Sequence, residues 1–402
     1  GGFFMRKRYF LITFAIITII AGVWVLACKH PLGNGLTFPK AEENEEEVGI
    51  MDPDSTRSVV FNNTCIIPAL TVTKDNTLIA AVGNKYLKGE ILIKTSKDLG
   101  KTWISNNVEI RGDKITSFAH PFFINCNNGD ILLGIATTNA GQNSVSFYRC
   151  LSGQTNWSKE NGAEINRPTA PKNQANNKLN PGNAFATYGN AIALKHGTND
   201  KNTLLVPYYY KRQDKPVSGI ISTMISTNNG KTWTTNGNDE GDYSSRGAKF
   251  IEIENGNILY FMNNEQGTAW FESTNCGKTS KVITSFSDEA HNEIQVMYAD
   301  FVRYEFNGED IIKSGSGKKY ALMAYSSSGG TYGVKLTTDD FNNGQNTGSG
   351  KFYNQEVGIS SLSETYPSIT VLKDGTICTL AAEETNEIVF RRFELKWLMN
   401  EY

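Results

Sequence analysis

Short apolar runs alternate with polar stretches along almost the whole chain from Ser58 to Trp397. The apolar runs have the length of single strands, and the stretches between them are rich in Asn, Gly, Asp and Ser, which favour tight turns. Beyond the first 28 residues, no segment has helical periodicity over ten residues. The pattern therefore predicts an all-β fold, with strands that include 69–73, 77–82, 131–136, 190–194, 203–209, 250–253, 257–262, 320–325, 369–372 and 376–381.

Two short patterns recur within this region. The first is an apolar strand, a turn that ends in Gly or Asn, and a second apolar strand, found at 70–79, 123–132, 250–259 and 369–378. The second is an octapeptide of the form S-x-(D/N)-x-G-x-T-(W), found at 96–103, 226–233 and 273–280, with weaker copies at 151–157 and 337–344. One copy of each pattern makes a four-stranded sheet, and small sheets repeated at intervals of tens of residues are typical of a β-propeller. Six such units fit the length, so we predict a six-bladed β-propeller.

The octapeptide has a local structural explanation. Its Asp or Asn can bond to the backbone two residues further on, and its Gly supplies the positive φ of a tight turn. Its Trp is expected to pack the turn against the next strand. We therefore interpret these residues as structural and not as catalytic.

The N-terminus is predicted to be a targeting segment. A basic stretch, Arg6-Lys7-Arg8, precedes an almost unbroken apolar run that ends at Val25-Leu26-Ala27-Cys28. This ending resembles a bacterial lipoprotein cleavage box, with Cys28 as the site of lipid attachment; an uncleaved signal anchor is the alternative. Residues 29–56 are acidic and read as a flexible tether, which leaves 57–402 for the propeller. Both alternatives predict an extracytoplasmic protein that is attached to a membrane.

Composition excludes several other functions. Lys plus Arg number 39 against 41 Asp plus Glu, so the formal charge of −2 gives no support for nucleic acid as a partner. The cysteines after Cys28 show no CxxC spacing and no pairing with His, which argues against a zinc site. We expect mostly buried free thiols, with one or two disulfides as the alternative, and we expect no metal and no cofactor.

From these motifs, the chain resembles the sialidase (neuraminidase) superfamily over roughly residues 57–400. The octapeptides are similar to the Asp-boxes of that family. Other segments that resemble family motifs, in the family's order, are Cys65–Leu70, Leu205–Lys211, Thr365–Ile369 with Leu380–Glu383, and Phe393–Leu398, the last as a closing strand. The resemblance implies a sialidase-like propeller that acts on glycans.

The resemblance also implies chemical roles for individual residues. Sialidases hold the substrate carboxylate with three arginines, because guanidinium groups match carboxylate geometry. They use a Tyr as nucleophile, a Glu that takes its proton, and an Asp as general acid/base. By position, Tyr366 matches the nucleophile and Glu252 its partner, and both are candidate catalytic residues. Glu383 matches an acidic residue of the last blade that helps to hold the first arginine.

The chain departs from the family pattern at the substrate-binding positions. Ile66 replaces the first arginine, none occurs at 267–270, and Lys335 is the cation nearest to the third. The acid/base Asp is absent near Lys85, and His120 stands where the family often has Asp-Pro.

We therefore assign substrate binding to Glu383, Lys335, Lys85 and His120, and ask whether Arg57, Arg246 or Arg303 reaches the site from another loop. Structural alternatives remain for each candidate. Tyr366 fits a core or rim position, Glu252 a solvent-facing strand position, Glu383 and His120 ordinary loops, and the lysines a solvated surface.

Three functions are compatible with this pattern. The first is a glycoside hydrolase of the exo-α-sialidase type acting on sialylated or related glycans, against which the missing arginines and Asp argue. The second is an inactive propeller that binds glycans or a protein. The third is a glycosidase for a sugar other than sialic acid, which would not need the arginines.

Overall fold

The computed structural model describes most of the chain after residue 50. The described residues are 51–62, 67–83, 90–106, 120–139, 142–160, 179–212, 219–236, 248–264, 267–279, 281–285, 296–312, 319–327, 330–341, 352–362, 365–384 and 387–401. Cys28 with the rest of the predicted targeting segment, Ile66, Lys85 and Arg246 lie outside them. In the described part of the chain, no helix has both the length and the apolar character needed to cross a bilayer.

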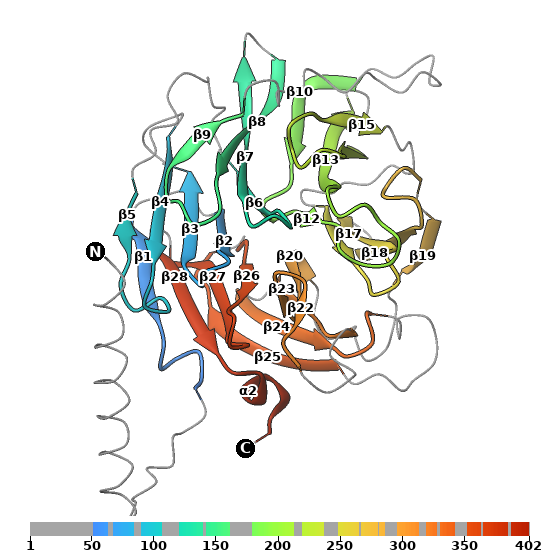
Figure 1. Ribbon diagram of the computed structural model, residues 1–402. Coiled ribbons are helices and arrows are strands. Elements are labelled where there is room, and N and C mark those ends of the chain that lie inside the picture. Colours follow the sequence, from blue (N-terminus) through green and yellow to red (C-terminus); the bar gives the residue numbers. More distant parts are fainter. Residues whose placement is uncertain are drawn as a thin grey trace, which may run out of the picture. The chain divides into compact units, whose positions relative to one another are not determined.

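The fold is a six-bladed β-propeller, which confirms the predicted fold class (Figure 1). From the axis outward, blade 1 contains β2 (Pro68–Val72), β3 (Leu78–Gly83), β4 (Ile91–Ser96) and β5 (Ile104–Ser105). Blade 2 contains β6 (Pro121–Asn125), β7 (Ile131–Asn139), β8 (Gln142–Cys150) and β9 (Trp157–Lys159). Blade 3 contains β10 (Leu179–Ala186), β13 (Leu204–Arg212), β14 (Gly219–Ser226) and β15 (Thr234–Asn236).

The remaining blades follow the same scheme. Blade 4 contains β16 (Lys249–Glu252), β17 (Ile258–Asn264), β18 (Gly267–Ser273) and β19 (Lys281–Ser285). Blade 5 contains β20 (Val296–Arg303), β23 (Ala321–Ser327), β24 (Thr331–Thr337) and β25 (Phe352–Ile359). Blade 6 contains β26 (Ser368–Val371), β27 (Ile377–Glu384), β28 (Glu387–Phe393) and β1 (Ser58–Asn62). The predicted strand-turn-strand repeats are the inner hairpins of blades 1, 2, 4 and 6.

The ring is closed by the first strand of the chain. β1 is the outermost strand of blade 6 and pairs antiparallel with β28, with Ser58 opposite Phe390. The last blade is therefore built from both ends of the propeller sequence. The sequence repeats do not show this closure, because β1 lies outside the repeating unit.

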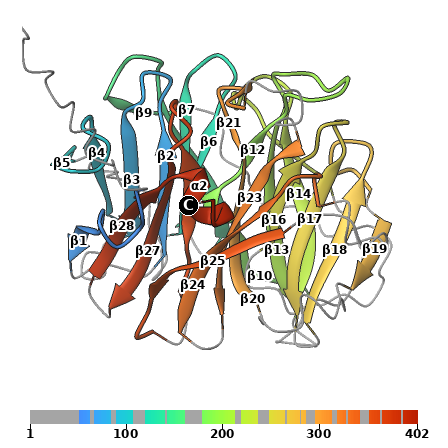
Figure 2. The same cartoon turned by 90° about the horizontal axis from the view of Figure 1, so that it is seen from below.

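The innermost strands run along the axis in the same direction, as the parallel pairing of β11 (Gly189–Asn190) with β6 shows. Figure 2 shows the propeller from the side. Contacts join their corresponding positions: Thr71 bonds to Asn125 near the ends of β2 and β6, and Arg303 bonds to the carbonyl of Glu252 at the ends of β20 and β16. The propeller thus has two distinct faces at its axis. We name them the start face, where the inner strands begin, and the turn face, where they end and the octapeptide turns lie.

The octapeptide turns are held by side-chain hydrogen bonds, but the Asp or Asn bonds to the backbone four residues further on and not two as predicted. Asp98 accepts bonds from the backbone N–H and the hydroxyl of Thr102, at 2.9 and 2.6 Å, and Ser96 Oγ accepts from Gly100 N–H at 2.8 Å. The turns that begin at Ser226 and Ser273 repeat this network.

The tryptophan of the turn packs differently from the prediction. Trp103 contacts Phe390 of blade 6, and Trp233 stacks on Phe147 of blade 2 at a centroid distance of 4.4 Å. Each ring therefore joins its turn to the preceding blade instead of packing on the next strand of its own blade. The apolar core lies between the blades, so both faces of the inner strands are buried, as in β2 and β3.

The C-terminal segment also differs from the prediction. β28 ends at Phe393, and Leu395–Met399 form a short helix, α2, where a closing strand was expected. The helix buries Leu398 and places Trp397 against Phe393, at a centroid distance of 4.8 Å. Apolar positions three residues apart fit one face of a helix, and the short segment does not distinguish this spacing from a strand pattern.

Candidate ligand-binding site at the propeller axis

Three tyrosines gather at the axis on the start face. Tyr366 lies two residues before β26, Tyr298 lies near the start of β20, and Tyr188 lies just before β11 (Gly189–Asn190). Tyr366 packs on Tyr298 at a centroid distance of 3.9 Å and meets Tyr188 edge-on at 5.2 Å. All three are at least 95% buried, and they form one cluster with Ile67. Tyr366 therefore belongs to an aromatic layer at the hub.

Blade 3 sends a loop into the axis to build this layer. Its inner strand is interrupted: β10 and β12 (Ile192–Ala193) pair with β13, while β11 between them pairs in parallel with β6 of blade 2. Gly189 makes the diversion possible, since its φ is +64° and an added Cβ would lie 2.6 Å from Asp300 Oδ2. The interruption brings Tyr188 and Asn190 to the hub.

A buried ion pair lies beneath the tyrosines. Lys249 Nζ is 2.7 Å from Asp300 Oδ1, and neither side chain is exposed. Lys249 also donates to the carbonyls of Tyr188 and Asn190, and lies 4.8 Å from the centre of the Tyr188 ring. Complete burial lowers the pKa of Lys249, and the charge of Asp300 opposes this shift.

Asp300 is the junction of several blades. Its oxygens accept bonds from the backbone and side chain of Asn190, the hydroxyl of Ser368 and the backbone of Ile369. Ser368 Oγ in turn accepts from Leu70 N–H of blade 1, at 3.0 Å. Every carboxylate oxygen is thus engaged, and Lys249 is committed to Asp300. This lysine contacts the tyrosine layer through Tyr188.

His120 begins at the same face. It directly precedes β6, at the start of the inner strand of blade 2, and is partly buried. Burial lowers the pKa of His120 to about 4, so the imidazole is neutral near pH 7. It therefore adds no positive charge to this face near pH 7.

The structure does not bring Glu252 to Tyr366. Glu252 is the last residue of β16, so it lies at the turn face, whereas Tyr366 precedes the first residue of β26 at the start face. The Glu252 carboxylate accepts from Lys195 N–H at 2.6 Å and from Asn199 Nδ2 at 2.8 Å, and it is 4% exposed, not solvent-facing. Burial raises its pKa, although both of these hydrogen bonds oppose the shift. This placement gives no support for Glu252 as the base of Tyr366.

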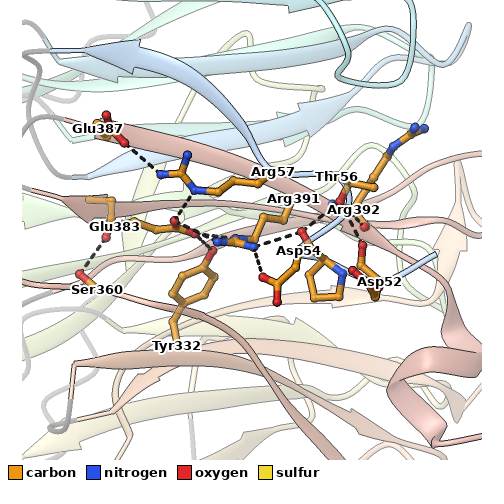
Figure 3. Close-up of polar contacts among 12 residues, drawn as sticks. Asp52, Asp54, Thr56, Arg57, Tyr332, Ser360, Glu383, Glu387, Arg391 and Arg392 are labelled. Carbon is orange, nitrogen blue, oxygen red and sulfur yellow. Dashed lines mark hydrogen bonds and ion pairs between the residues drawn. The ribbon is translucent and has the colours of Figure 1, made fainter. Parts of the chain in front are cut away.

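Glu383 lies in a polar cluster between blades 5 and 6, drawn in Figure 3. Its carboxylate accepts from Arg391 Nε at 2.6 Å, from Arg57 Nε at 3.1 Å and from the hydroxyl of Tyr332 at 2.7 Å. Burial alone would raise the pKa of Glu383, but these donors outweigh it and the pKa is lowered. Glu383 therefore does hold arginines, as the resemblance implies, but they come from β28 and from the segment before β1.

The cluster fastens the start of the propeller sequence to blade 6. Arg391 also binds Asp54 Oδ1 at 2.6 Å and the carbonyl of Pro53 at 3.1 Å, and Thr56 exchanges bonds with the backbone of Arg392 (Figure 3). We call residues 51–57 the clasp. These contacts begin within the span predicted as a tether.

The other candidate cations are also engaged elsewhere. Lys335 lies on β24, 8% exposed, with its Nζ 5.2 Å from the centre of the Tyr325 ring, and burial lowers its pKa. Its position differs from the solvated alternative. Arg57 is held by Glu383 and Glu387, and Arg303 lies at the turn face.

Sequence reasoning missed four hub residues: Tyr188, Tyr298, Lys249 and Asp300. A signal was present for the two charged ones. Lys249 stands in the apolar run Ala248–Ile251, and Asp300 stands between Ala299 and Phe301. A charge inside a buried strand requires a partner, so these two residues could have been paired by elimination.

The cysteines and metal-binding groups complete the description. Cys126, Cys150 and Cys378 are buried free thiols and Cys276 is a partly exposed one. Within the described ranges, no group of three or more His, Cys, Asp or Glu side chains is arranged to hold a metal ion.

Comparison with solved structures places this fold among known propellers. The Hadza microbial sialidase Hz136 matches with a TM-score of 0.58 and 17% identity over 83% of this chain. Trypanosoma rangeli sialidase in complex with sialic acid matches with a TM-score of 0.58 and 14% identity over 87% of this chain. A Dyadobacter fermentans protein of unknown function matches with a TM-score of 0.61 and 13% identity over 84%.

The fold is sialidase-like. This chain spans 98% of the Dyadobacter protein, but only 66% of the Hadza sialidase and 59% of the trypanosomal one. No protein-family model and no curated protein matches the sequence. At these identities the likeness concerns the fold alone.

Proposed function

We propose that this protein is a glycan-binding propeller that receives a sugar on its start face, over the tyrosine layer. The observation that carries the proposal is the packing of Tyr188, Tyr298 and Tyr366 at the axis of a sialidase-like fold. Tyrosines combine an apolar ring with a polar hydroxyl, and both parts suit a sugar.

Binding without sialidase-type turnover fits the charges at the hub. A tyrosine with an ordinary pKa near 10 needs a base or a cation to act as a nucleophile at neutral pH. Glu252 lies at the opposite face, and Lys249 is neutralised by Asp300. These two placements favour a binding site over the sialidase mechanism.

Hydrolysis of a sialoside is the second candidate. It is supported by the sialidase-like fold and by the position of Tyr366 just before the innermost strand of the last blade. As part of the same proposal, the predicted lipid attachment at Cys28 would hold the protein at an extracytoplasmic membrane surface.

Two assays on the full-length protein separate these candidates. We expect a glycan array to give binding that Tyr366→Phe or Tyr298→Ala reduces, and a fluorogenic sialoside to give no release above background. Sialoside release that Tyr366→Phe abolishes would replace the binding function with the hydrolase. Absence of both binding and turnover would contradict a glycan-directed function altogether.

A further inference from the structure

A cavity lies at the axis on the turn face. It has a volume of about 110 Å³ and is bounded by the ends of the inner strands and by the hairpin of β21 (Glu305–Phe306) and β22 (Glu309–Asp310). Asn190 belongs both to this cavity and to the Asp300 junction, so the buried junction separates the cavity from the tyrosine layer. None of the three tyrosines of the start face lines it.

The charged groups of the cavity balance one another. Lys195, Arg303, Glu252 and Glu305 all line it. Lys195 Nζ lies 3.5 Å and His196 Nε2 lies 3.2 Å from Glu305 Oε1. These contacts outweigh the effect of burial and lower the pKa of Glu305 to about 2. Two cations and two anions give a lining with no net charge, which favours a neutral ligand over an ion.

Arg303 offers an unused donor. Its side chain is 7% exposed, and Nη1 binds Asp340 and the carbonyl of Glu252. Its Nη2 is buried with no hydrogen-bond partner among the described residues. A buried guanidinium N–H without an acceptor is unfavourable, so an acceptor oxygen atom from a bound molecule would stabilise this group.

Glu252 offers the complementary acceptor. The hydrogen bonds given to its carboxylate come from uncharged donors: the backbone N–H groups of Lys195 and His196 and the amide of Asn199. A carboxylate can accept about four hydrogen bonds, so capacity remains for a donor from a ligand. A hydroxyl group both donates and accepts, and is therefore the simple group that satisfies Glu252 and Arg303 alike.

We propose that this cavity binds a neutral polyhydroxylated molecule, a single sugar residue in class. The amides of Asn125 and Asn127 add polar groups to the lining, and Val72, Phe306 and Val371 provide apolar wall for the C–H face of a sugar ring. This site is independent of the proposed function, because it lies on the other face.

Calorimetric titration of the full-length protein tests the proposal, with D-glucose, D-galactose, D-mannose and N-acetylglucosamine as probes and N-acetylneuraminic acid as the charged comparison. We expect at least one neutral sugar to bind. Glu252→Gln should weaken it about 10- to 100-fold, which corresponds to one charge-assisted hydrogen bond. Glu356→Gln is the matched control: Glu356 is exposed on β25, the outermost strand of blade 5, and does not line the cavity, so this variant should bind the same sugar unchanged.

A second variant tests whether Glu252→Gln weakens binding by disturbing the fold and not by removing a contact to the sugar. Arg303→Leu combined with Asp340→Leu removes the donor and its buried counter-ion together, and should also abolish binding while circular dichroism remains that of the wild type. The proposal is overturned if no neutral sugar binds below about 10 mM, if only N-acetylneuraminic acid binds, or if Tyr366→Phe and not Glu252→Gln removes binding. A failed glycan array with intact calorimetric binding would contradict the start-face function and leave this site standing.

Discussion

At the scale of single residues, buried charges decide what each site can do. At the hub, the charge of Lys249 is balanced by the carboxylate of Asp300. Removing either side chain would leave the other charge buried without a partner, which would lower the free energy of unfolding by about 3–5 kcal/mol. Such a lysine is a structural element of the hub, and a ligand of the proposed kind on the start face would meet tyrosines and a neutral histidine. Specificity at this face therefore depends on shape and on hydrogen bonds more than on charge.

His120 should make the fold sensitive to moderate acid. Its pKa falls from 6.5 in the unfolded chain to about 4 in the fold, so the unfolded state binds a proton first. The stabilisation is fully present above pH 6.5 and is lost as the pH falls from 6.5 toward 4. Between pH 6.5 and pH 5 the loss is on the order of 2 kcal/mol. Chemical denaturation at pH 7.5 and pH 5 measures this loss.

The matched variant for this test is His120→Asn, which keeps a polar side chain without titrating in this range. We expect its stability to change less between the two pH values than that of the wild type. Equal changes in the two proteins would show that other groups produce the acid sensitivity.

At the scale of elements, the octapeptide turns connect blades as well as strands. Gly230 has a φ of +86°, and a Cβ there would lie 2.3 Å from Leu132 Cδ1 of the preceding blade. Gly100 meets Phe390 in the same way. The glycine thus serves two needs: it adopts the positive φ of the turn, and it leaves space for a side chain of the neighbouring sheet.

Gly230→Ala should therefore destabilise the fold more than the backbone conformation alone explains. Gly153 is the matched control, because its φ is +76° but a Cβ there would meet nothing within 4 Å. We expect Gly153→Ala to cost about 1–2 kcal/mol from the left-handed conformation, and Gly230→Ala to cost about 1–3 kcal/mol beyond that from overpacking. Urea unfolding of both variants makes the comparison, and equal losses would mean that the neighbouring blade yields without cost.

The elements were more predictable than their partners. The strand-turn-strand repeats predicted the inner hairpins of blades 1, 2, 4 and 6, and the octapeptides predicted the outer turns of blades 1, 3 and 4, because turn chemistry and strand length are local properties. The interrupted inner strand of blade 3 was expected as one run, 190–194, since the diversion of Gly189 and Asn190 to β6 depends on a partner in another blade. The direction of Trp103, which packs on Phe390 across the ring closure, is equally non-local.

At the scale of the whole molecule, the candidate site was less predictable than the fold. Tyr366 was found at the axis because it precedes an inner strand, and that position follows from the repeat. Glu252 was paired with it although β16 carries the glutamate to the other face. Alternation along a strand tells which side a residue faces, but the end of the strand that it occupies decides which face of a propeller it reaches.

The clasp should contribute to the stability of the entire ring. A fragment that begins at Ser58 lacks the contacts of Pro53, Asp54 and Arg57, and leaves Arg391 and Glu383 without part of their partners. We expect it to unfold at lower temperature than a fragment that begins at Ile50, where the compact unit starts. Differential scanning calorimetry of the two fragments measures the difference, and identical melting temperatures would show that the clasp adds nothing to ring closure.

The closing strand also sets an order of events during synthesis. Thr56 and Arg392 bond to each other although 336 positions separate them, so the strand that a ribosome releases first must wait for the one it releases almost last. At typical elongation rates this delay is roughly tens of seconds. Throughout that time Val60 and Phe61, which are buried in the finished protein, have no sheet to join. The nascent chain therefore exposes an unpaired apolar segment to whatever chaperone or translocation machinery receives it.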